Sequence, residues 1–240
     1  MVCIRAIPTS QQEQNGGVSR IAIIGAHGKV AQQLGRFLYD QGDDFVGVVR
    51  GEEHCDDIYR LGGEGVLLDL EKATAHELAN AVAGCDAIVF SAGAGPDSGV
   101  ERKRTVDYAG SVLSIEAARE AGIQRFVQVS AWGVDSPVAE NAEPQWRAYV
   151  EAKRDADAAL HDSHLDWTIL RPGSLTFETG TGLIEIGQHV PRGSISREDV
   201  ARVIAFCLSE PGSIGQTWEV VSGLTPLEEA VRSATGQDSL

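Results

Sequence analysis

The sequence predicts an α/β fold in which one mostly parallel, doubly wound sheet forms a single domain with a small C-terminal substrate lobe. Short apolar runs recur along the chain without polar alternation, which is typical of strands buried on both faces of a sheet. Amphipathic helical patterns lie between these runs, as a doubly wound sheet requires. The 27 glycines among 240 residues suit a fold with many tight strand-to-helix turns.

The candidate strands alternate with candidate helices from residue 21 onward. The strands are expected at residues 21–24, 45–49, 65–68, 87–90, 126–129 and 167–170. The helix after the first strand carries apolar residues on one face from Val30 to Leu38, and Gly42 falls where its C-cap is expected. A longer helix is expected to end at Gly122.

The last third of the chain departs from this rhythm. Residues 172–194 are rich in glycine and read as a long irregular excursion. Ser196 begins a helix, a strand follows at about 217–221, and Thr225 with Pro226 predicts a capping box for a final helix. We therefore expect a flexible segment at residues 1–19 and a binding domain at 20–240, whose substrate lobe takes about 172–196 and 222–240.

Composition narrows the classes of partner and compartment. The formal net charge of −15 disfavours nucleic acid and anionic membrane as partners. No apolar run is long enough to span a bilayer, and residues 1–19 lack the apolar core of a signal peptide. The four cysteines form neither a C-x-x-C pair nor a zinc pattern, and Cys85 and Cys207 lie in apolar stretches. We expect a cytoplasmic protein without metal, monomeric or homodimeric, that binds a small molecule.

The turn after the first strand has the composition of a phosphate-binding loop, with the spacing G-x-x-G-x-x-A. Gly25 allows a sharp turn, Gly28 allows a phosphate to approach the backbone, and Ala31 allows close packing of helix on strand. The helix N-terminus then offers free N–H groups to an anion. The expected contacts are Gly25, His27, Gly28, Lys29 and Val30. A merely structural turn is the alternative, and His27 either donates to a phosphate or faces solvent.

The ends of the next strands predict how the rest of a dinucleotide binds. Arg50 follows the second strand, where NAD-preferring sites usually carry an acidic residue, and its guanidinium suits a 2′-phosphate. NADP(H) is therefore the preferred cofactor, although Glu52 and Glu53 nearby leave NAD(H) open.

Two further strand ends carry expected cofactor contacts. Asp69 and Leu70 follow the third strand and are expected at the adenine, whereas Asp69 as a turn cap is the alternative. Ala92 and Gly93 follow the fourth strand and are small enough for the cofactor to pass close to the backbone.

These pieces together resemble the short-chain dehydrogenase/reductase superfamily, and more closely its atypical members that are similar to NAD-dependent epimerases/dehydratases. The resemblance spans roughly residues 20–235. It is carried by G-A-H-G at 25–28, V-R at 49–50, D-L at 69–70, V-S-A at 129–131, Y-V-E-A-K at 149–153, L-R-P-G at 170–173 and I-S-R-E-D-V-A at 195–201. It implies a Rossmann fold and a hydride-transfer site.

The resemblance also implies roles for individual residues. Tyr149 would be the general acid/base, and Lys153, on the same helix face, would hold the nicotinamide ribose and favour the phenolate. Ser130 would hydrogen-bond the substrate oxygen, although Ala131 stands where many relatives carry a second hydroxyl residue. The backbone of Pro172, Gly173 and Leu175 would lie against the nicotinamide. Among the tryptophans, Trp132 and Trp146 are expected near the substrate mouth, and Trp167 and Trp218 in the core.

Three functions are compatible with these residues. The first is an NADP(H)-dependent oxidoreductase that reduces a small carbonyl or quinone-like substrate. The second is a cofactor-binding redox sensor without turnover, like the NmrA-type regulators. The third is an epimerase or dehydratase that retains its cofactor, for which the short stretch after residue 170 leaves little room for a nucleotide sugar. The Tyr149/Lys153 pair favours an enzyme.

Overall fold

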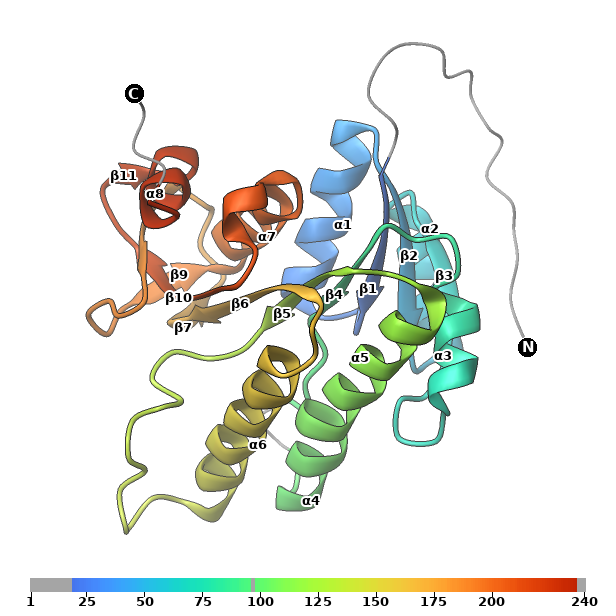
Figure 1. Cartoon of the computed structure of the whole chain (residues 1–240), viewed down its shortest axis with the longest axis horizontal. Coiled ribbons are helices and arrows are strands. Elements are labelled where there is room, and N and C mark those ends of the chain that lie inside the picture. Colours follow the sequence, from blue (N-terminus) through green and yellow to red (C-terminus); the bar gives the residue numbers. More distant parts are fainter. Residues whose placement is uncertain (1–18, 96–97, 237–240) are drawn as a thin grey trace.

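A nine-stranded sheet forms the centre of the molecule in the computed structural model, which describes residues 19–95 and 98–236 (Figure 1). The strand order is β11-β8-β10-β6-β5-β4-β1-β2-β3. The parallel strands are β1 (Arg20–Ile24), β2 (Asp44–Val49), β3 (Glu64–Leu67), β4 (Ala87–Phe90), β5 (Arg125–Val129), β6 (Asp166–Pro172) and β10 (Gln216–Ser222). The chain adds strands toward one edge of the sheet from β1 to β3 and toward the other edge from β4 onward. The parallel strands β1 and β4 therefore flank the switch point, where ligands bind in open α/β sheets.

Helices cover both faces of this sheet and bury two separate cores. The first core includes side chains of α1 (Lys29–Gln41), α2 (Glu52–Arg60), α7 (Arg197–Ser209) and α8 (Leu227–Ala234). The second includes side chains of α3 (Ala75–Ala81), α5 (Ala109–Ala121) and α6 (Pro144–His161). In Figure 1, α1 and α7 lie above the sheet, and α5 and α6 lie below it. The predicted doubly wound Rossmann architecture is confirmed.

The helix boundaries follow from local chemistry. Val30, Leu34 and Leu38 lie on the buried face of α1, and Gly42 ends the helix with φ of 85°, a left-handed conformation that favours glycine. Gly122 ends α5 in the same way, with φ of 74°. The helix that leads into α5 is not uniform, because a short α4 (Val100–Arg102) passes into a π-helical turn, η1 (Lys103–Tyr108), before α5 begins.

The expected irregular excursion at 172–194 contains regular structure, so that prediction was wrong in part. β7 (Ser174–Thr176) pairs with β9 (Ser194–Ser196) in a separate two-stranded sheet. β8 (Leu183–Gly187) runs antiparallel to β10 and extends the main sheet. Residues 183–186 alternate between exposed and more buried positions, the period of a strand with one solvent-facing side, but glycines on both sides of the strand hide so short a pattern in the sequence.

The two predicted C-terminal caps have different outcomes. Ser196 caps α7 as expected, because its hydroxyl accepts a hydrogen bond from the Asp199 N–H at 2.9 Å. The capping box at Thr225 is wrong. Thr225 pairs with Ile184 in the short strand β11 (Thr225–Pro226), Pro226 is the N-cap of α8, and no side chain caps that helix. A 3₁₀ turn, η2 (Pro211–Ser213), joins α7 to β10.

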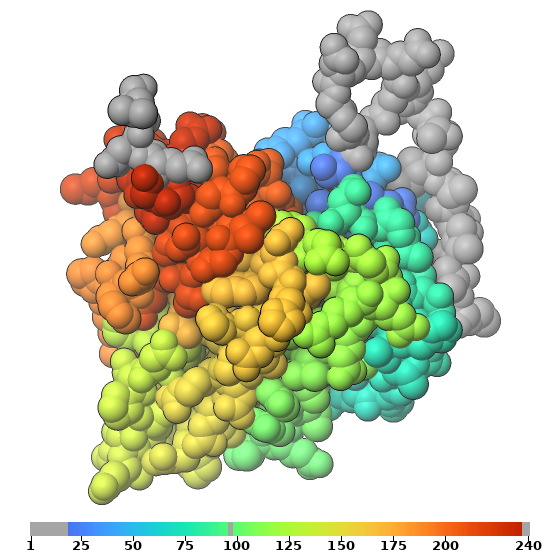
Figure 2. Space-filling view, viewed as in Figure 1, coloured from blue at the N-terminus to red at the C-terminus, as the bar shows by residue number. Residues whose placement is uncertain are grey.

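Of the C-terminal helices, α7 packs directly against α1. In Figure 2, the segment between β5 and α6 projects from the body of the molecule at the lower left. Residues 1–18 of the expected flexible lead-in lie outside the described residues. In the described part of the chain, no helix has the length and apolar character needed to cross a membrane.

Candidate functional site

A cavity of about 1180 Å³ opens at the carboxyl ends of the central strands, where the sequence predicts the dinucleotide. It slightly exceeds the ~300–1,000 Å³ of typical small-molecule sites, so its volume allows more than one small ligand. Trp132 and Trp146 line it, as expected, whereas Trp218 is buried in the core. The predicted site residues that line the cavity are Gly28, Lys29, Val30, Ala92, Gly93, Ser130, Tyr149, Lys153, Pro172, Gly173 and Leu175.

The loop between β1 and α1 has the geometry of an anion cradle. Gly25 has φ of 80°, and a Cβ there would lie 2.6 Å from the Cα of Ala92. The Gly28 N–H donates to the Gly25 carbonyl at 2.9 Å, which closes the turn. Gly28 is the N-cap of α1 and supplies no side-chain cap, so the first N–H groups of the helix remain free for a ligand. This donor set fits the phosphates of a dinucleotide.

Five predicted contacts lie outside the lining of this cavity: Gly25, His27, Arg50, Asp69 and Leu70. The Arg50 side chain is 60% exposed, and its Nη1 lies 3.9 Å from Glu71 Oε2. Asp69 caps the next turn, because it accepts the Glu71 N–H at 3.1 Å, and it pairs with Lys72 at 3.0 Å. Its neighbouring donors hold the pKa of the Asp69 carboxyl below its usual value against the opposing effect of burial. The roles of these five residues toward the cofactor stay predictions.

His27 packs against α2 rather than projecting freely into solvent. Its ring stacks on His54 with centroids 3.5 Å apart, and its Nε2 lies 3.3 Å from Asp57 Oδ2. The carbonyl of His27 accepts a hydrogen bond from the Gln32 side chain at 2.9 Å. These contacts fix the phosphate loop against the second helix and against the first turn of α1.

Lys153 is held in the cavity wall by a buried ion pair. Its Nζ donates to the Val129 carbonyl at 3.1 Å and lies 3.4 Å from Asp107 Oδ1. The other oxygen of Asp107 accepts the Ala94 N–H at 3.0 Å. Lys153 is 5% exposed and Asp107 1%. The pair therefore ties α6 to the loop after β4, and the ammonium is positioned beside the space for a ligand.

Tyr149 lies one helical turn before Lys153 on the same face of α6, so both line the cavity. Burial raises the pKa of the Tyr149 phenol above its ordinary value, while the Lys153 ammonium lowers it in part. The Lys103 ammonium lies 5.5 Å from the centre of the Tyr149 ring, and the Trp146 ring centre is 5.6 Å away. A protonated phenol next to cations can donate a proton to a ligand oxygen.

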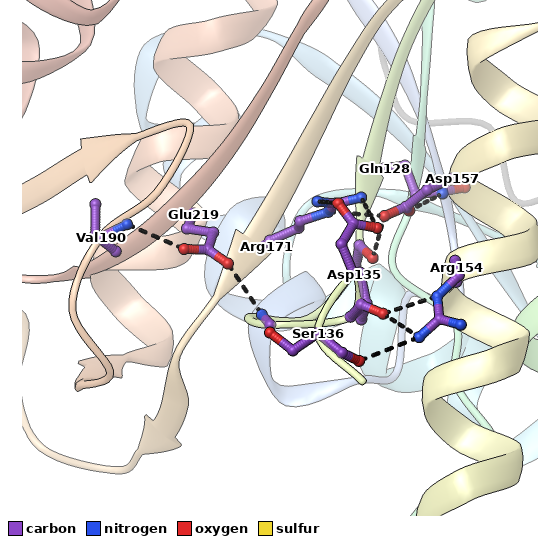
Figure 3. A network of polar contacts seen from close by, with 11 residues as sticks. Gln128, Asp135, Ser136, Arg154, Asp157, Arg171, Val190 and Glu219 are labelled. Atoms are coloured by element: carbon purple, nitrogen blue, oxygen red, sulfur yellow. Dashed lines mark hydrogen bonds and ion pairs between the residues drawn. The ribbon is translucent and has the colours of Figure 1, made fainter. Parts of the chain in front are cut away.

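Ser130 is part of a buried polar network centred on Asp157. Figure 3 shows Gln128, Arg171 and Asp157 of this network. Its hydroxyl donates to Asp157 Oδ2 at 2.8 Å, and the Gln128 amide donates to Oδ1 at 2.8 Å. Arg171 Nε also donates to Asp157, at 2.9 Å, and its guanidinium pairs with Asp135. Burial raises the pKa of Asp157, and Arg171 opposes the rise. The Ser130 proton is thus already donated, so donation to a substrate oxygen requires this bond to break; the catalytic role of Ser130 stays a prediction.

A second carboxylate, Glu219 on β10, holds together two loops at the rim of the cavity (Figure 3). Its two oxygens accept the N–H groups of Gly133 and Val190, each at 3.0 Å. The Trp132 indole donates to the Val190 carbonyl at 3.0 Å. Arg154 donates from α6 to the Val134 carbonyl at 2.8 Å. These bonds fix the first residues of the segment that follows β5.

Sequence reasoning missed Asp107, Asp157 and Glu219. Asp157 lies eight residues after Tyr149 and four after Lys153, so the helical period alone could have placed it on the same face. Asp107 lies in the π-helical turn, where the ordinary period fails. In the described ranges, no group of three or more His, Cys, Asp or Glu side chains is placed to hold a metal ion.

Comparison with known proteins agrees with this geometry. Residues 25–211 match a family model described as NAD(P)H-binding. An uncharacterized sugar epimerase, YhfK, from Bacillus subtilis is 38% identical over 89% of this chain and 99% of its own. A candidate NAD-dependent epimerase/dehydratase from Bacillus halodurans is 38% identical, covers 90% of this chain and 99% of its own, and has a TM-score of 0.82.

A second solved structure, the oxidoreductase ylbE from Lactococcus lactis, is 28% identical, covers 92% of this chain and 99% of its own, and has a TM-score of 0.79. The matched region of the family model begins at Gly25 in the phosphate loop and includes Tyr149 and Lys153. This chain therefore belongs to the family of NAD(P)H-binding Rossmann-fold proteins that includes epimerase/dehydratase-like and short-chain dehydrogenase/reductase-like members.

Proposed function

We propose that the protein is an NADP(H)-dependent oxidoreductase that reduces a small carbonyl or quinone-like substrate. One observation carries the proposal: Tyr149 and Lys153 share a single cavity with the uncapped N-terminus of α1. A phosphate cradle and a proton donor with a supporting cation are what hydride transfer to a carbonyl requires. Ala92, Gly93 and the backbone of Pro172 and Gly173 supply the small and rigid walls between them.

In the proposed reduction, different residues of the chain donate the proton and stabilise the resulting phenolate. The nicotinamide, when bound, supplies the hydride to the carbonyl carbon. Tyr149 gives its proton to the carbonyl oxygen, so that an alcohol forms and the phenolate remains. The Lys153 ammonium stabilises that phenolate, and Asp107 and the Val129 carbonyl hold the ammonium in place. Trp132 and Trp146 add apolar surface to the lining of the same cavity.

The preference for NADP(H) rests on Arg50. Its exposed guanidinium directly follows β2, and a 2′-phosphate would replace its 3.9 Å ion pair with Glu71. Arg50→Asp should shift the ratio of affinities from NADPH toward NADH, measured by calorimetry. Arg36→Asp, at an exposed position of α1, makes the same change of charge and should leave the ratio unaltered. An unchanged ratio in Arg50→Asp would remove this residue from cofactor selection.

The test of catalysis is turnover of NADPH with a panel of aldehydes, ketones and quinones, followed by the loss of nicotinamide absorbance. Tyr149→Phe should lower kcat at least about a hundredfold and leave NADPH affinity nearly intact, because only the proton donor is lost. Tyr108→Phe removes a hydroxyl outside the cavity lining and serves as the control. Unchanged turnover in Tyr149→Phe would exclude the phenol as the acid.

Two alternatives predict other outcomes of the same assay. A redox sensor binds NADP(H) but oxidises none of it with any acceptor. An epimerase, the activity in the names of the two relatives at 38% identity, restores its cofactor in each cycle and shows no net oxidation. Inversion at a sugar carbon, followed by NMR in D₂O with a panel of nucleotide sugars, separates the epimerase from the sensor.

A further inference from the structure

The cavity carries positive charge in an acidic protein. The cationic side chains in its lining are Lys29, Lys103, Lys153, Arg192 and Arg197. Its acidic side chains are Asp107 and Glu143. The lining therefore has a net charge of +3, whereas the whole chain carries −15. Cations concentrated at one concave site of such a protein indicate an anionic ligand there.

One buried side-chain nitrogen has no hydrogen-bond partner, and it is Nη1 of Arg197. Within residues 19–95 and 98–236, every other buried side-chain nitrogen or oxygen has a partner. The Arg197 guanidinium carbon lies 3.9 Å from the centre of the Phe177 ring, so the planar group is held by stacking. A buried charged donor without an acceptor is costly, more so than a neutral one. Nη1 itself has almost no accessible surface, but Arg197 is only half-buried, and no hydrogen bond or ion pair of the described residues involves its guanidinium. Its other donors, in the cavity lining, are therefore available to an anionic oxygen of a ligand.

The position of Arg197 indicates which ligand supplies that oxygen. Arg197 follows β9, whose last residue, Ser196, pairs with Thr176 of β7. β7 directly follows Pro172 and Gly173, the segment expected against the nicotinamide. The adenosine end of the site, in contrast, is expected at the ends of β2 and β3. Arg197 thus lies at the nicotinamide end, where the substrate binds.

The neighbouring wall extends this cationic surface. Arg192, which is exposed, lines the cavity from the segment before β9. Lys103 is 6% exposed and lies in the cavity lining beside Tyr149, where it donates to the Gly95 carbonyl. Trp132, Trp146 and Leu175 add apolar surface to the same lining. The combination suits a planar apolar body with an acidic substituent.

We propose that Arg197 binds a carboxylate or sulfonate of the substrate, so that the protein acts on anionic carbonyl or quinone compounds in preference to neutral ones. This inference rests on the proposed function, because it concerns the second ligand of the same cavity. Arg197 orients that ligand through its acid group, while Tyr149 faces the reducible oxygen.

Two pairs of probes test the proposal, each with one acidic and one neutral member. The first is 4-carboxybenzaldehyde with 4-formylbenzamide, and the second is 1,2-naphthoquinone-4-sulfonate with 1,2-naphthoquinone. Their affinities for the protein saturated with NADP⁺ are measured by calorimetry, which requires no turnover. The acidic member of at least one pair should bind at least tenfold more tightly in the native protein, a difference of about 1.4 kcal/mol.

Arg197→Met should bring the ratio of affinities close to one, and Arg197→Lys should restore part of it. Arg202→Met removes a cation from the same helix but outside this lining, and should keep the native ratio. The proposal would be overturned if the native protein bound the acidic and neutral members of each pair equally, or bound none of the four probes. It would also be overturned if Arg197→Met kept the native ratio of affinities. So would an Arg197→Met variant whose main defect is at least tenfold weaker NADPH binding, since the anion would then be the cofactor's diphosphate.

The two proposals fail in different ways. If acidic probes bind selectively through Arg197 but no NADPH is oxidised, the oxidoreductase function fails and the anion site stands. If NADPH is oxidised with neutral and acidic probes at the same kcat/KM, the anion site fails and the reductase stands.

Discussion

The buried pair of Lys153 and Asp107 allows a quantitative test of how the site is held together. The two charges are 3.4 Å apart, and both residues are at most 5% exposed. At an effective dielectric constant of ~20, their attraction is about 5 kcal/mol before the cost of desolvation. Removing one partner of a buried pair costs about 3–5 kcal/mol, because the other charge stays buried without compensation.

Asp107→Asn removes the charge but keeps an oxygen that can accept the Ala94 N–H. We therefore expect the free energy of unfolding in urea, without cofactor, to fall by about 3 kcal/mol. The double variant Asp107→Asn/Lys153→Met removes the orphaned ammonium as well and should be more stable than Asp107→Asn alone. Asp155→Asn breaks the exposed pair with Arg104 and should cost no more than about 1 kcal/mol.

The reasoning would be refuted in either of two ways. The free energy of unfolding of Asp107→Asn could lie within about 1 kcal/mol of the native value, well below the ~3–5 kcal/mol expected for breaking a buried pair. Alternatively, the effects of Asp107→Asn and Lys153→Met could simply add in the double variant, which would show that the two side chains are not energetically coupled.

Three further predictions concern other residues. Gly25→Ala should lower the free energy of unfolding by about 2 kcal/mol or more and weaken NADPH binding, because φ is 80° and the new Cβ would meet Ala92; native stability in urea would contradict this. Burial raises the pKa of Cys85 to about 11 and that of Cys207 to about 12, so neither thiol should react with Ellman's reagent at about pH 8 until the protein unfolds. Because burial raises the pKa of Tyr149 above its ordinary value, its acid form persists in alkali. kcat/KM for reduction should therefore stay level through the neutral range and decline only in strong alkali; a decline centred near neutral pH would argue against Tyr149 as the acid.

Much of the fold is readable from sequence because the central strands are buried on both faces. Their apolar runs are continuous, so β4 was predicted at its observed bounds of Ala87–Phe90. The strands at the C-terminal edge have no such signal. β8 is partly exposed and flanked by glycines, and the two residues of β11 pair only because β8 lies beside them. Their pairing depends on tertiary contacts that local patterns do not contain.

The candidate site also contains some residues that a local sequence pattern predicts and others that only tertiary contacts bring into place. Tyr149 and Lys153 follow from a fixed spacing on one helix, and the structure brings both into one cavity with Gly28. Asp107 is contributed by a π-helical turn and reaches Lys153 across the cavity wall, which no spacing rule describes. The Ser130 hydroxyl shows the opposite case, because a residue chosen by motif is bonded to a buried carboxylate that the motif does not include.

Glu219 accepts the N–H of Gly133, in the segment between β5 and α6, and the N–H of Val190, in the segment before β9, and so fixes the base of the first segment to the second. Residues 136–143 extend beyond this base, and several of them contribute to the cavity. This tip is held from α6 by Arg147 and Arg154, which donate to the carbonyls of Ser136, Ala139 and Glu140. Because the tip is held through its backbone carbonyls, substitutions of its side chains would reshape the cavity mouth without displacing Tyr149, Lys153 or the phosphate cradle. In this architecture, surface side chains set the shape of the cavity mouth, while the residues beneath it are held by separate contacts.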